Sequence, residues 1–318
     1  MAREQLGICA EANLHGSYLL INVLDGQEAM LRQKLTRLPQ IINRLADHFS
    51  EAMLSGVVAI SSHFWDSLYP WQRPAGLSAF PEFRSEHFQV SHSMADLFIQ
   101  VRSDRTDVNY IALQQIYQLI SPNVEIVENL SGFRYLDGRQ LTGFIDAPTN
   151  PRGIKRRKAA LVDALNDPVF AGGSYLYFYR LQLDQKHWLQ LSTEQQEAIM
   201  GYQKLDGKKC AADAEIRSSH LTAQHVVLAP NDAMLLEQNM PYASLHTQGA
   251  LQLCFSAESD VFSRLWRSKL GLQQSGIYDG LLDFCRIDLA AAFFVPSITF
   301  MEAAARGEFT ARSSHLLE

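Results

Sequence analysis

The sequence has little cysteine and no spacing that would put it to use. Four cysteines in 318 residues are far apart in the chain, namely Cys9, Cys210, Cys254 and Cys285. They form no Cys-x-x-Cys pair and no zinc-binding spacing. Scattered thiols of this kind are typical of small buried side chains in a reducing compartment. The pattern therefore argues against a disulfide scaffold and against a structural zinc site.

Long apolar runs and excess positive charge are also missing. No stretch has the roughly 20 apolar residues that a membrane helix needs. The first residues, MAREQLGICAEANLHG, carry charge early and lack the apolar core of a secretion signal. A net charge of −6 and a pI near 5.9 argue against a nucleic-acid partner. We therefore expect a cytoplasmic protein that binds neither nucleic acid nor membrane.

The chain is long enough for one large domain or two medium ones, at 318 residues with an ordinary 47% hydrophobic content. Its first half predicts a β-α-β-β-α-β order. A helix is expected over residues 27–47, and Asp107 can cap a second one. Strands are expected at residues 17–24, 56–61, 96–102 and 123–130. This order is the split unit of a ferredoxin-like half, with an antiparallel sheet and helices on one face.

The second half repeats that order loosely. Ser192 can cap a helical segment, and residues 203–216 are expected to form a polar loop. Strands are expected at residues 172–183, 225–228, 233–238 and 249–256, and helices within 184–202, 259–270 and 277–286. An apolar segment at 293–300 is broken by Pro296, and a polar tail follows Arg306. The two halves share element order and no residue-level repeat.

The stretch Gly132–Pro151, GFRYLDGRQLTGFIDAPTNP, is dense in Gly and Pro and therefore predicts a shaped loop. Asp146 follows its apolar Gly-Phe-Ile run. A carboxylate beside apolar neighbours is costly unless it is paired, hydrogen-bonded or protonated, and such groups are enriched in functional sites. Taken alone, these residues favour a structural turn in which Asp146 accepts backbone N–H bonds, with a functional acid as the alternative.

The stretch resembles the signature of the dye-decolourising peroxidases, GF-x-Y-x-DGRDLTGF-x-DGT-x-NP. Gln140 and Ala147 depart from that pattern, while the matching positions are Gly132, Phe133, Tyr135, Asp137, Gly138, Arg139, Leu141, Thr142, Gly143, Phe144, Asp146, Asn150 and Pro151. The resemblance implies a haem peroxidase, with haem b as cofactor, that reduces hydrogen peroxide and oxidises dyes or phenolic compounds. In the family, the acid corresponding to Asp146 faces the open side of the haem and manages the protons of peroxide.

The resemblance extends over essentially the whole chain, since WDSLYP at 65–70, DLFIQVRSDR at 96–105 and FFVPS at 293–297 also look like family positions. It implies an α+β fold of two ferredoxin-like halves with antiparallel sheets, in a dimeric α+β barrel-like arrangement. We expect the halves at residues 1–150 and 151–305, the second carrying the haem ligand, and a polar tail at 306–318. Family members commonly form dimers or larger rings, so a homodimer or higher homo-oligomer is expected.

His220 lies where the family carries the histidine that binds the haem iron, although the Arg that usually follows is missing. Spacing alone does not choose His220 over His225. The resemblance implies that a carboxylate from YDGLLDF supports this histidine; Asp279 is the better match and Asp283 the alternative. Ile145 and Ala147, on either side of Asp146, are expected to contact the haem.

The strongest departure is Glu237. The family usually reads I-[VL]-R-x-[SN]-MPYG, whereas residues 234–243 here read MLLEQNMPYA, so Glu237 stands at the Arg position and Asn239 keeps a family-compatible amide. A carboxylate provides neither the donors nor the positive charge of a guanidinium, and losing one such donor typically costs about 100- to 1000-fold in rate. Two neighbouring carboxylates would also repel, raising one pKa. Alternatively, Glu237 turns away or pairs with Arg217, Arg264 or Lys155.

Three hypotheses follow. The first is a haem peroxidase of reduced activity that uses Asp146, Asn239 and Glu237 at its catalytic site. The second is a haem- or porphyrin-binding protein with little or no peroxidase activity. The third, loss of haem, is disfavoured by the retention of Asp146, Asn239 and His220. The basic run Arg152–Lys158 is interpreted as a solvated helix start, with contact to anionic groups such as haem propionates as the alternative.

Overall fold

A computed structural model describes residues 2–82, 90–210, 219–223, 235–272 and 278–309. Its first half contains the predicted β-α-β-β-α-β unit, and its four long strands lie in the order β5-β1-β4-β2, every neighbouring pair antiparallel. The elements are η1 (Leu6–Cys9), β1 (His15–Val23), α1 (Glu28–Leu35), α2 (Leu38–His48), η2 (Ser50–Ala52), β2 (Ser55–Ser61), α3 (Trp65–Leu68), β3 (Val90–His92), β4 (Leu97–Ser103), α4 (Thr106–Ile120), η3 (Ser121–Asn123) and β5 (Val124–Phe133).

The second half contributes strands in the order β10-β6-β9-β7, also antiparallel, and β8 pairs with β9 beyond them. Its elements are α5 (Ile154–Ala160), β6 (Ser174–Leu183), α6 (Gln185–Trp188), α7 (Thr193–Met200), β7 (Leu236–Glu237), β8 (Met240–Ala243), β9 (Gln248–Ser256), α9 (Val261–Lys269), η4 (Gly280–Phe284), β10 (Cys285–Val295) and α10 (Ile298–Ala305). Strand β10 joins the halves, because it also pairs with β2 through Phe293↔Ser61 and Phe294↔Ile60.

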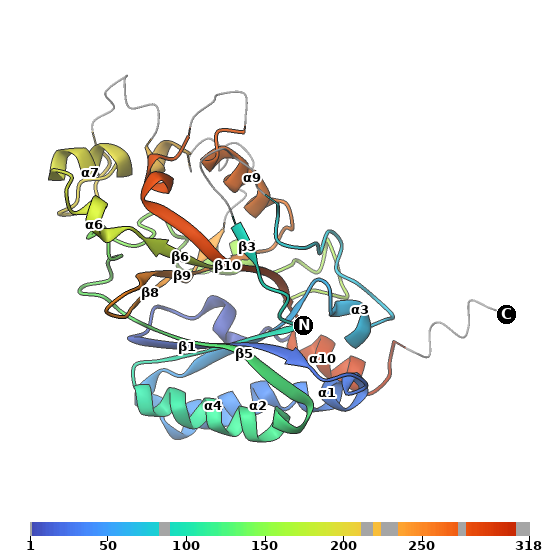
Figure 1. Cartoon of the computed structure of the whole chain (residues 1–318). Coiled ribbons are helices and arrows are strands. Elements are labelled where there is room, and N and C mark those ends of the chain that lie inside the picture. Colours follow the sequence, from blue (N-terminus) through green and yellow to red (C-terminus); the bar gives the residue numbers. More distant parts are fainter. Residues whose placement is uncertain (1, 83–89, 211–218, 224–234, 273–277, 310–318) are drawn as a thin grey trace.

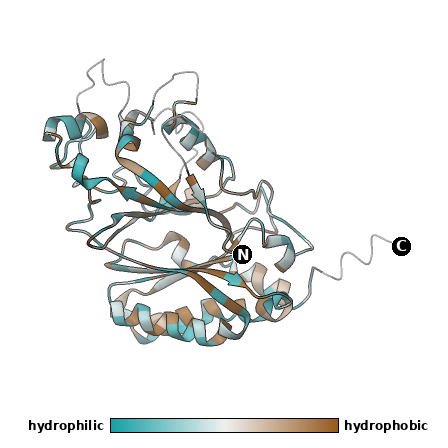
Figure 2. Ribbon diagram, in the orientation of Figure 1, coloured by the Kyte–Doolittle hydropathy of each residue, from teal (hydrophilic) through white to brown (hydrophobic). Residues whose placement is uncertain are grey.

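The two halves face each other through their sheets, with helices outside (Figure 1). Side chains from both halves fill the space between the sheets, among them Tyr18, Phe98, Phe178 and Phe293, whose rings contact one another. Helices α2 and α4 cover the outer face of the first sheet, and both show apolar and polar segments in Figure 2, as amphipathic helices do. The α+β fold of two ferredoxin-like halves is therefore confirmed. No helix in the described ranges is long and apolar enough to cross a bilayer.

Two details of the predicted helices are wrong and one is confirmed. The helix over residues 27–47 is broken into α1 and α2 at Thr36 and Arg37, and Pro39 lies in the first turn of α2, where its missing N–H costs nothing. Asp107 does not cap α4, which begins at Thr106; it lies in the first turn and pairs with Arg105. Ser192 does cap α7 by accepting from the Gln195 backbone N–H.

The end of the chain differs most from the expectation. The helix expected over 277–286 is only a short 3-10 helix, η4, and Cys285 already begins the long strand β10. Most of β10 is buried on both faces, so its Ala- and Phe-rich sequence lacks the alternation that marks a half-buried strand. The strand expected at 225–228, most of the tail and residues 211–216 lie outside the described residues. The proposed boundaries of the halves stay a prediction.

Candidate functional site

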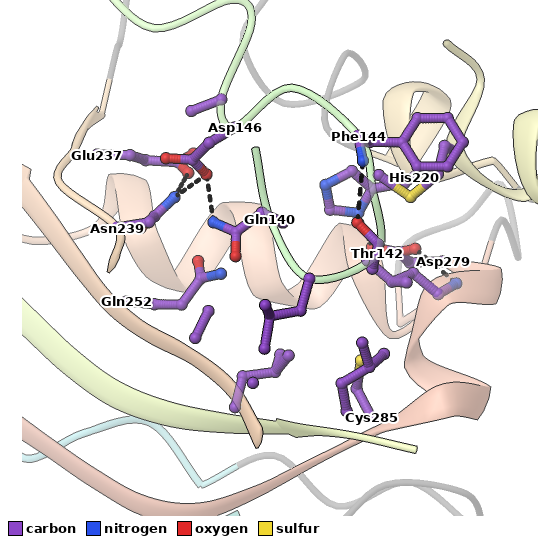
Figure 3. A pocket seen from close by; sticks show the side chains of 18 of the residues that line it. Gln140, Thr142, Phe144, Asp146, His220, Glu237, Asn239, Gln252, Asp279 and Cys285 are labelled. Atoms are coloured by element: carbon purple, nitrogen blue, oxygen red, sulfur yellow. Dashed lines mark hydrogen bonds and ion pairs between the residues drawn. The ribbon is translucent and has the colours of Figure 1, made fainter. Parts of the chain in front are cut away.

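A cavity opens between the sheet of the second half and the loop that follows β5. It contains about 910 Å³ of space not filled by atoms, part of it continuous with solvent. Strands β6 and β9, helix α9 and η4 contribute to its lining. Apolar side chains such as Phe144, Leu181 and Leu183 alternate with a few ionisable ones. Figure 3 shows the ionisable residues in two groups, Asp146 with Glu237 on one side and His220 with Asp279 on the other.

The loop Gly132–Pro151 is held in shape from inside. Arg139 binds the Asp137 carboxylate through Nε at 2.8 Å and donates to the carbonyls of Gly143 and Leu205, both at 2.9 Å. Gly143 has φ of +89°, which glycine adopts without strain. Ala147 has a φ of +39° where the resembling pattern carries Gly, so this departure places a side chain in a strained backbone conformation. The loop is therefore a rigid wall of the cavity.

Asp146 is bound by side-chain amides. Its Oδ1 accepts from Asn239 Nδ2 at 3.0 Å and from Gln140 Nε2. Among the residues that the structure describes, no backbone N–H donates to this carboxyl. The Asx-turn interpretation is therefore not supported. Burial raises the pKa of Asp146 to about 6, the Glu237 charge adds to the rise, and the two amides and the charge of Arg102 partly oppose it.

Glu237 stays beside Asp146. The Asn239 amide nitrogen donates to Glu237 Oε2 at 2.9 Å as well as to Asp146, so one NH₂ group lies between two carboxylates. The backbone of Glu237 is fixed by Asn150, which donates to its carbonyl at 2.7 Å and accepts from its N–H at 3.0 Å. Within the described part of the chain Glu237 has no ion pair: Arg264 pairs with Asp260, Lys155 does not reach it, and Arg217 lies outside.

Gln238, between Glu237 and Asn239, points the other way and anchors this segment. Its Nε2 donates to the carbonyls of Gly7 and Ile8 at 2.9 and 2.8 Å, and its Oε1 accepts from Arg102 Nη1 at 2.8 Å. Gln238 and Arg102 are both buried, at 4% and 2% exposure. The Gln238 side chain therefore contacts the first half. Because successive side chains in extended backbone point to opposite sides, Glu237 and Asn239 point away from Gln238 and line the cavity.

The other wall carries a histidine–carboxylate pair. His220 Nδ1 lies 2.7 Å from Asp279 Oδ2, and the Asp279 side chain is completely buried. Asp279 Oδ1 accepts from the Leu281 backbone N–H at 3.0 Å. Burial opposes ionisation of Asp279, but the His220 ring, the Lys269 charge and the Leu281 bond outweigh it, so its pKa lies below the ordinary value. Asp283 accepts from the Tyr278 hydroxyl at 3.0 Å instead, and His225 lies outside the described residues.

These residues fit a haem. An imidazole whose Nδ1 is bound to a carboxylate has its Nε2 as the metal-binding nitrogen, and a buried carboxylate partner is the usual support for a metal-ligating histidine. The described residues contain no group of three or more His, Cys, Asp or Glu side chains that could hold a bare metal ion. One supported imidazole in an apolar cavity suits iron whose other ligands come from a macrocycle.

All the site residues expected from the sequence line this one cavity: Asp146, Glu237, Asn239, His220, Asp279, Ile145 and Ala147. Sequence reasoning missed Gln140, which departs from the pattern, as well as Asn150 and Gln238. In the basic run, Arg156 donates to the Cys9 carbonyl at 3.2 Å and Arg157 pairs with Glu4, and neither lines the cavity. Contact of these two arginines with haem propionates is therefore not supported.

Comparison with known families decides the wider assignment. The family descriptions "Dyp-type peroxidase, N-terminal" and "Dyp-type peroxidase, C-terminal" match residues 5–134 and 137–300. The chain belongs to the Dyp-type peroxidase family. As a member of this family it is a haem peroxidase, an oxidoreductase that acts on peroxide.

Individual members of the family are similar to this chain over most of their length. A Dyp-type peroxidase protein of Shewanella oneidensis is 36% identical, with a TM-score of 0.90 over 95% of this chain and 98% of that one. DypB of Rhodococcus jostii, solved as a variant in complex with haem, is 26% identical, with a TM-score of 0.86 over 92% and 96% of the two chains. The dye-decolorizing peroxidase of Mycobacterium tuberculosis is 27% identical over 90% of this chain and 86% of its own.

Proposed function

We propose that this Dyp-type peroxidase binds haem b through His220, uses Asp146 as the acid–base group for hydrogen peroxide, and oxidises dyes or phenolic compounds at a rate reduced by Glu237. The observation that carries the proposal is the arrangement of one cavity. A supported imidazole, His220 with Asp279, forms one side, and an acid with a pKa of about 6 forms the other.

The His220 side would hold the cofactor. Asp279 accepts the Nδ1 proton, which fixes the ring orientation and makes Nε2 a stronger electron donor to iron. Ile145 and Ala147 would pack against the haem from the loop side. When bound, haem would supply the redox chemistry that carries electrons from the aromatic reductant to peroxide.

Asp146 would move the protons. Conversion of hydrogen peroxide to two water molecules takes up two protons and two electrons. During this conversion one proton must pass from one peroxide oxygen to the other. Both hydrogen bonds that the described residues donate to the Asp146 carboxyl are to Oδ1, so Oδ2 is the oxygen available to take and return that proton. A pKa of about 6 suits both steps, because near neutral pH the group is a competent base and its conjugate acid still donates.

Glu237 would slow this reaction for two reasons. It brings no N–H donor and no positive charge to the oxygen that leaves, and the lack of one such donor typically costs about 100- to 1000-fold. Its negative charge also raises the pKa of Asp146, which lowers the fraction of the base form at a given pH. Asn239 offsets part of this effect because its amide separates the two carboxylates. A homo-oligomer in the cytoplasm remains our expectation for assembly and location.

The test begins with the apo-protein titrated with haem. We expect a Soret band that is lost or strongly shifted in His220→Ala. His187→Ala is the matched control, because His187 also pairs with an aspartate, Asp184, but is exposed and does not line the cavity. Peroxide-dependent bleaching of a bulky dye then separates an enzyme from a haem- or porphyrin-binding protein. Haem binding without dye turnover would overturn the proposed activity, and an unchanged spectrum in His220→Ala would overturn the proposed ligand.

A further inference from the structure

Gln140 departs from the resembling pattern on the same cavity wall as Glu237. The pattern has Asp at position 140, and here the Gln140 Nε2 donates to Asp146 Oδ1. Its backbone is held in the loop, since its N–H donates to the Phe144 carbonyl and its own carbonyl accepts from Gly143, both at 2.9 Å. The amide is therefore delivered to Asp146 by a fixed piece of backbone.

Few hydrogen-bond donors are available to the two carboxyl groups of Asp146 and Glu237, and the Gln140 amide is one of them. Asn239 has two amide hydrogens, and one donates to Asp146 while the other donates to Glu237. Asn239 is thus fully used by the two carboxylates. Gln140 is the second donor to Asp146 within the described residues. An acid at position 140 would replace that donor with an acceptor and gather three carboxyl groups on one wall.

Few charges can offset such a cluster. Arg102 acts on Asp146 through its charge, but the guanidinium donates to Gln238 and does not contact the carboxyl. Asp146 or Glu237 also acts on the Cys254 thiol and on the Tyr179 and Tyr202 hydroxyls, none of which is a permanent cation. Lys269 is a cation that lines the same cavity, and its charge acts on Asp279 and Cys254. An acid at position 140 is therefore compatible with a cation at position 237 and incompatible with the carboxylate that is found there.

We propose that Gln140 is a positioning residue that supplies, from the loop side, a donor to Asp146 in a site whose position 237 provides none, and that residues 140 and 237 are energetically coupled. The role of Gln140 in peroxide chemistry rests on the proposed function above. The coupling itself does not, because it is a property of the folded apo-protein.

Four apo-proteins test the coupling: the natural chain, Gln140→Asp, Glu237→Arg and the double variant. Gln140→Asp is expected to lower the Tm by several degrees at pH 8, and by less at pH 5, where a protonated acid at this position can donate again. In the Glu237→Arg background the same change is expected to cost less than half as much at pH 8. Equal losses in both backgrounds, which is additivity, would overturn the proposal. Gln190→Asp, at an exposed position, is the control for adding a carboxylate.

A second variant separates the donor from the charge and keeps the test independent of a folding failure. Gln140→Met removes the amide without adding charge. Because the amide lowers the pKa of Asp146, its removal is expected to move the midpoint of the peroxide reaction to higher pH in the haem-loaded protein. An unchanged midpoint with normal haem content would show that Gln140 does not position Asp146. If no variant turns over peroxide, the four apo-proteins still decide the coupling, and only the proposed function fails.

Discussion

The two walls of the cavity balance charge in opposite ways. On one wall an ionised carboxylate, Asp279, is completely buried and is hydrogen-bonded to the His220 imidazole and to the Leu281 backbone N–H. On the other, Asp146 and Glu237 have the same sign of charge and are separated by the neutral amide of Asn239. The first wall stabilises its buried carboxylate with hydrogen-bond donors, whereas the second wall only limits the repulsion between two carboxyl groups.

This difference determines which wall tolerates the replacement of a single residue. A buried carboxylate that loses its hydrogen-bond donor is left unsatisfied at a cost of several kcal/mol, so His220 and Asp279 cannot change independently. On a wall built from neutral amides and an acid of raised pKa, replacing one neighbour changes the pKa of that acid and the stability of the fold only by small amounts. Gln140, Ala147 and Glu237 all lie on the amide wall. We therefore expect the wall of Asp146 to determine the rate and the wall of His220 to determine haem retention.

The largest effect is expected for Asp146→Asn. The carboxyl that moves the peroxide proton is lost while His220 and Asp279 are untouched, so the second-order rate of the haem protein with peroxide should fall by about 100- to 10,000-fold. Stopped-flow mixing with peroxide measures this rate, and the haem spectrum is the control. A loss below about tenfold would mean that the Asp146 wall does not determine the rate.

Glu237→Arg is expected to raise the peroxide rate by about 100-fold, because it adds donors and a positive charge beside Asp146. Glu237→Gln is the matched control: it removes the negative charge without adding a cation and should give a much smaller rise. An Arg variant no faster than the Gln variant would contradict the role assigned to this position.

Asp279→Asn should weaken haem binding by about 10- to 100-fold, since the histidine keeps its place but loses a charged acceptor. Haem transfer to a competing protein measures the affinity. Asp283→Asn is the control, because this acid contacts the Tyr278 hydroxyl and not His220. Equal losses in both variants would show that the choice of Asp279 is wrong.

The pH dependence of stability gives a smaller effect. The pKa of Asp146 rises from 3.8 to about 6 on folding, so the folded state favours the protonated form. Protonated Asp146 therefore contributes to the free energy of unfolding below pH 3.8, and this contribution is lost as pH rises through about 6. Asp146→Asn cannot ionise. Its Tm relative to the natural chain should therefore rise by a few degrees between pH 4 and pH 7, measured on apo-protein by scanning calorimetry. A difference that is constant with pH would contradict the raised pKa.

The smallest effect is expected for Ala147→Gly. The positive φ of Ala147 is strained for a side chain and free for glycine, so the variant should be more stable by about 0.5–1 kcal/mol in urea unfolding of the apo-protein. Ala171→Gly, in the segment between α5 and β6 and without positive φ, should be neutral or destabilising. A destabilised Ala147→Gly would mean that the methyl group makes contacts worth more than the strain.

Sequence reasoning found the cavity residues where a matching motif fixed the register, as for Asp146 and Asn239, whereas at His220 the match was short and left His225 as an alternative. It could not find the contacts of Asn150 or Gln238, because each joins segments that only the fold brings together. It also missed the contact of Gln140 with Asp146, six residues later, because the path of the loop cannot be read from its composition. Gln238 contacts Gly7 and Ile8, more than two hundred residues earlier in the chain. The same limit hid β10: a strand buried on both faces has no alternation, so its pattern does not differ from that of a buried helix.

Strand β10 also determines the order in which the parts of the sheet can form during synthesis. It is the last strand in the part of the chain that the structure describes, yet it lies between β2 of the first half and β6 of the second, and Asp279 comes just before it. The first half leaves the ribosome early and can form its own four strands. The inner edges of both halves stay unpaired until residues 285–295 emerge. The cavity wall that depends on β10 is therefore complete only after residues 285–295 have been made, so we expect the cofactor to be inserted after that point.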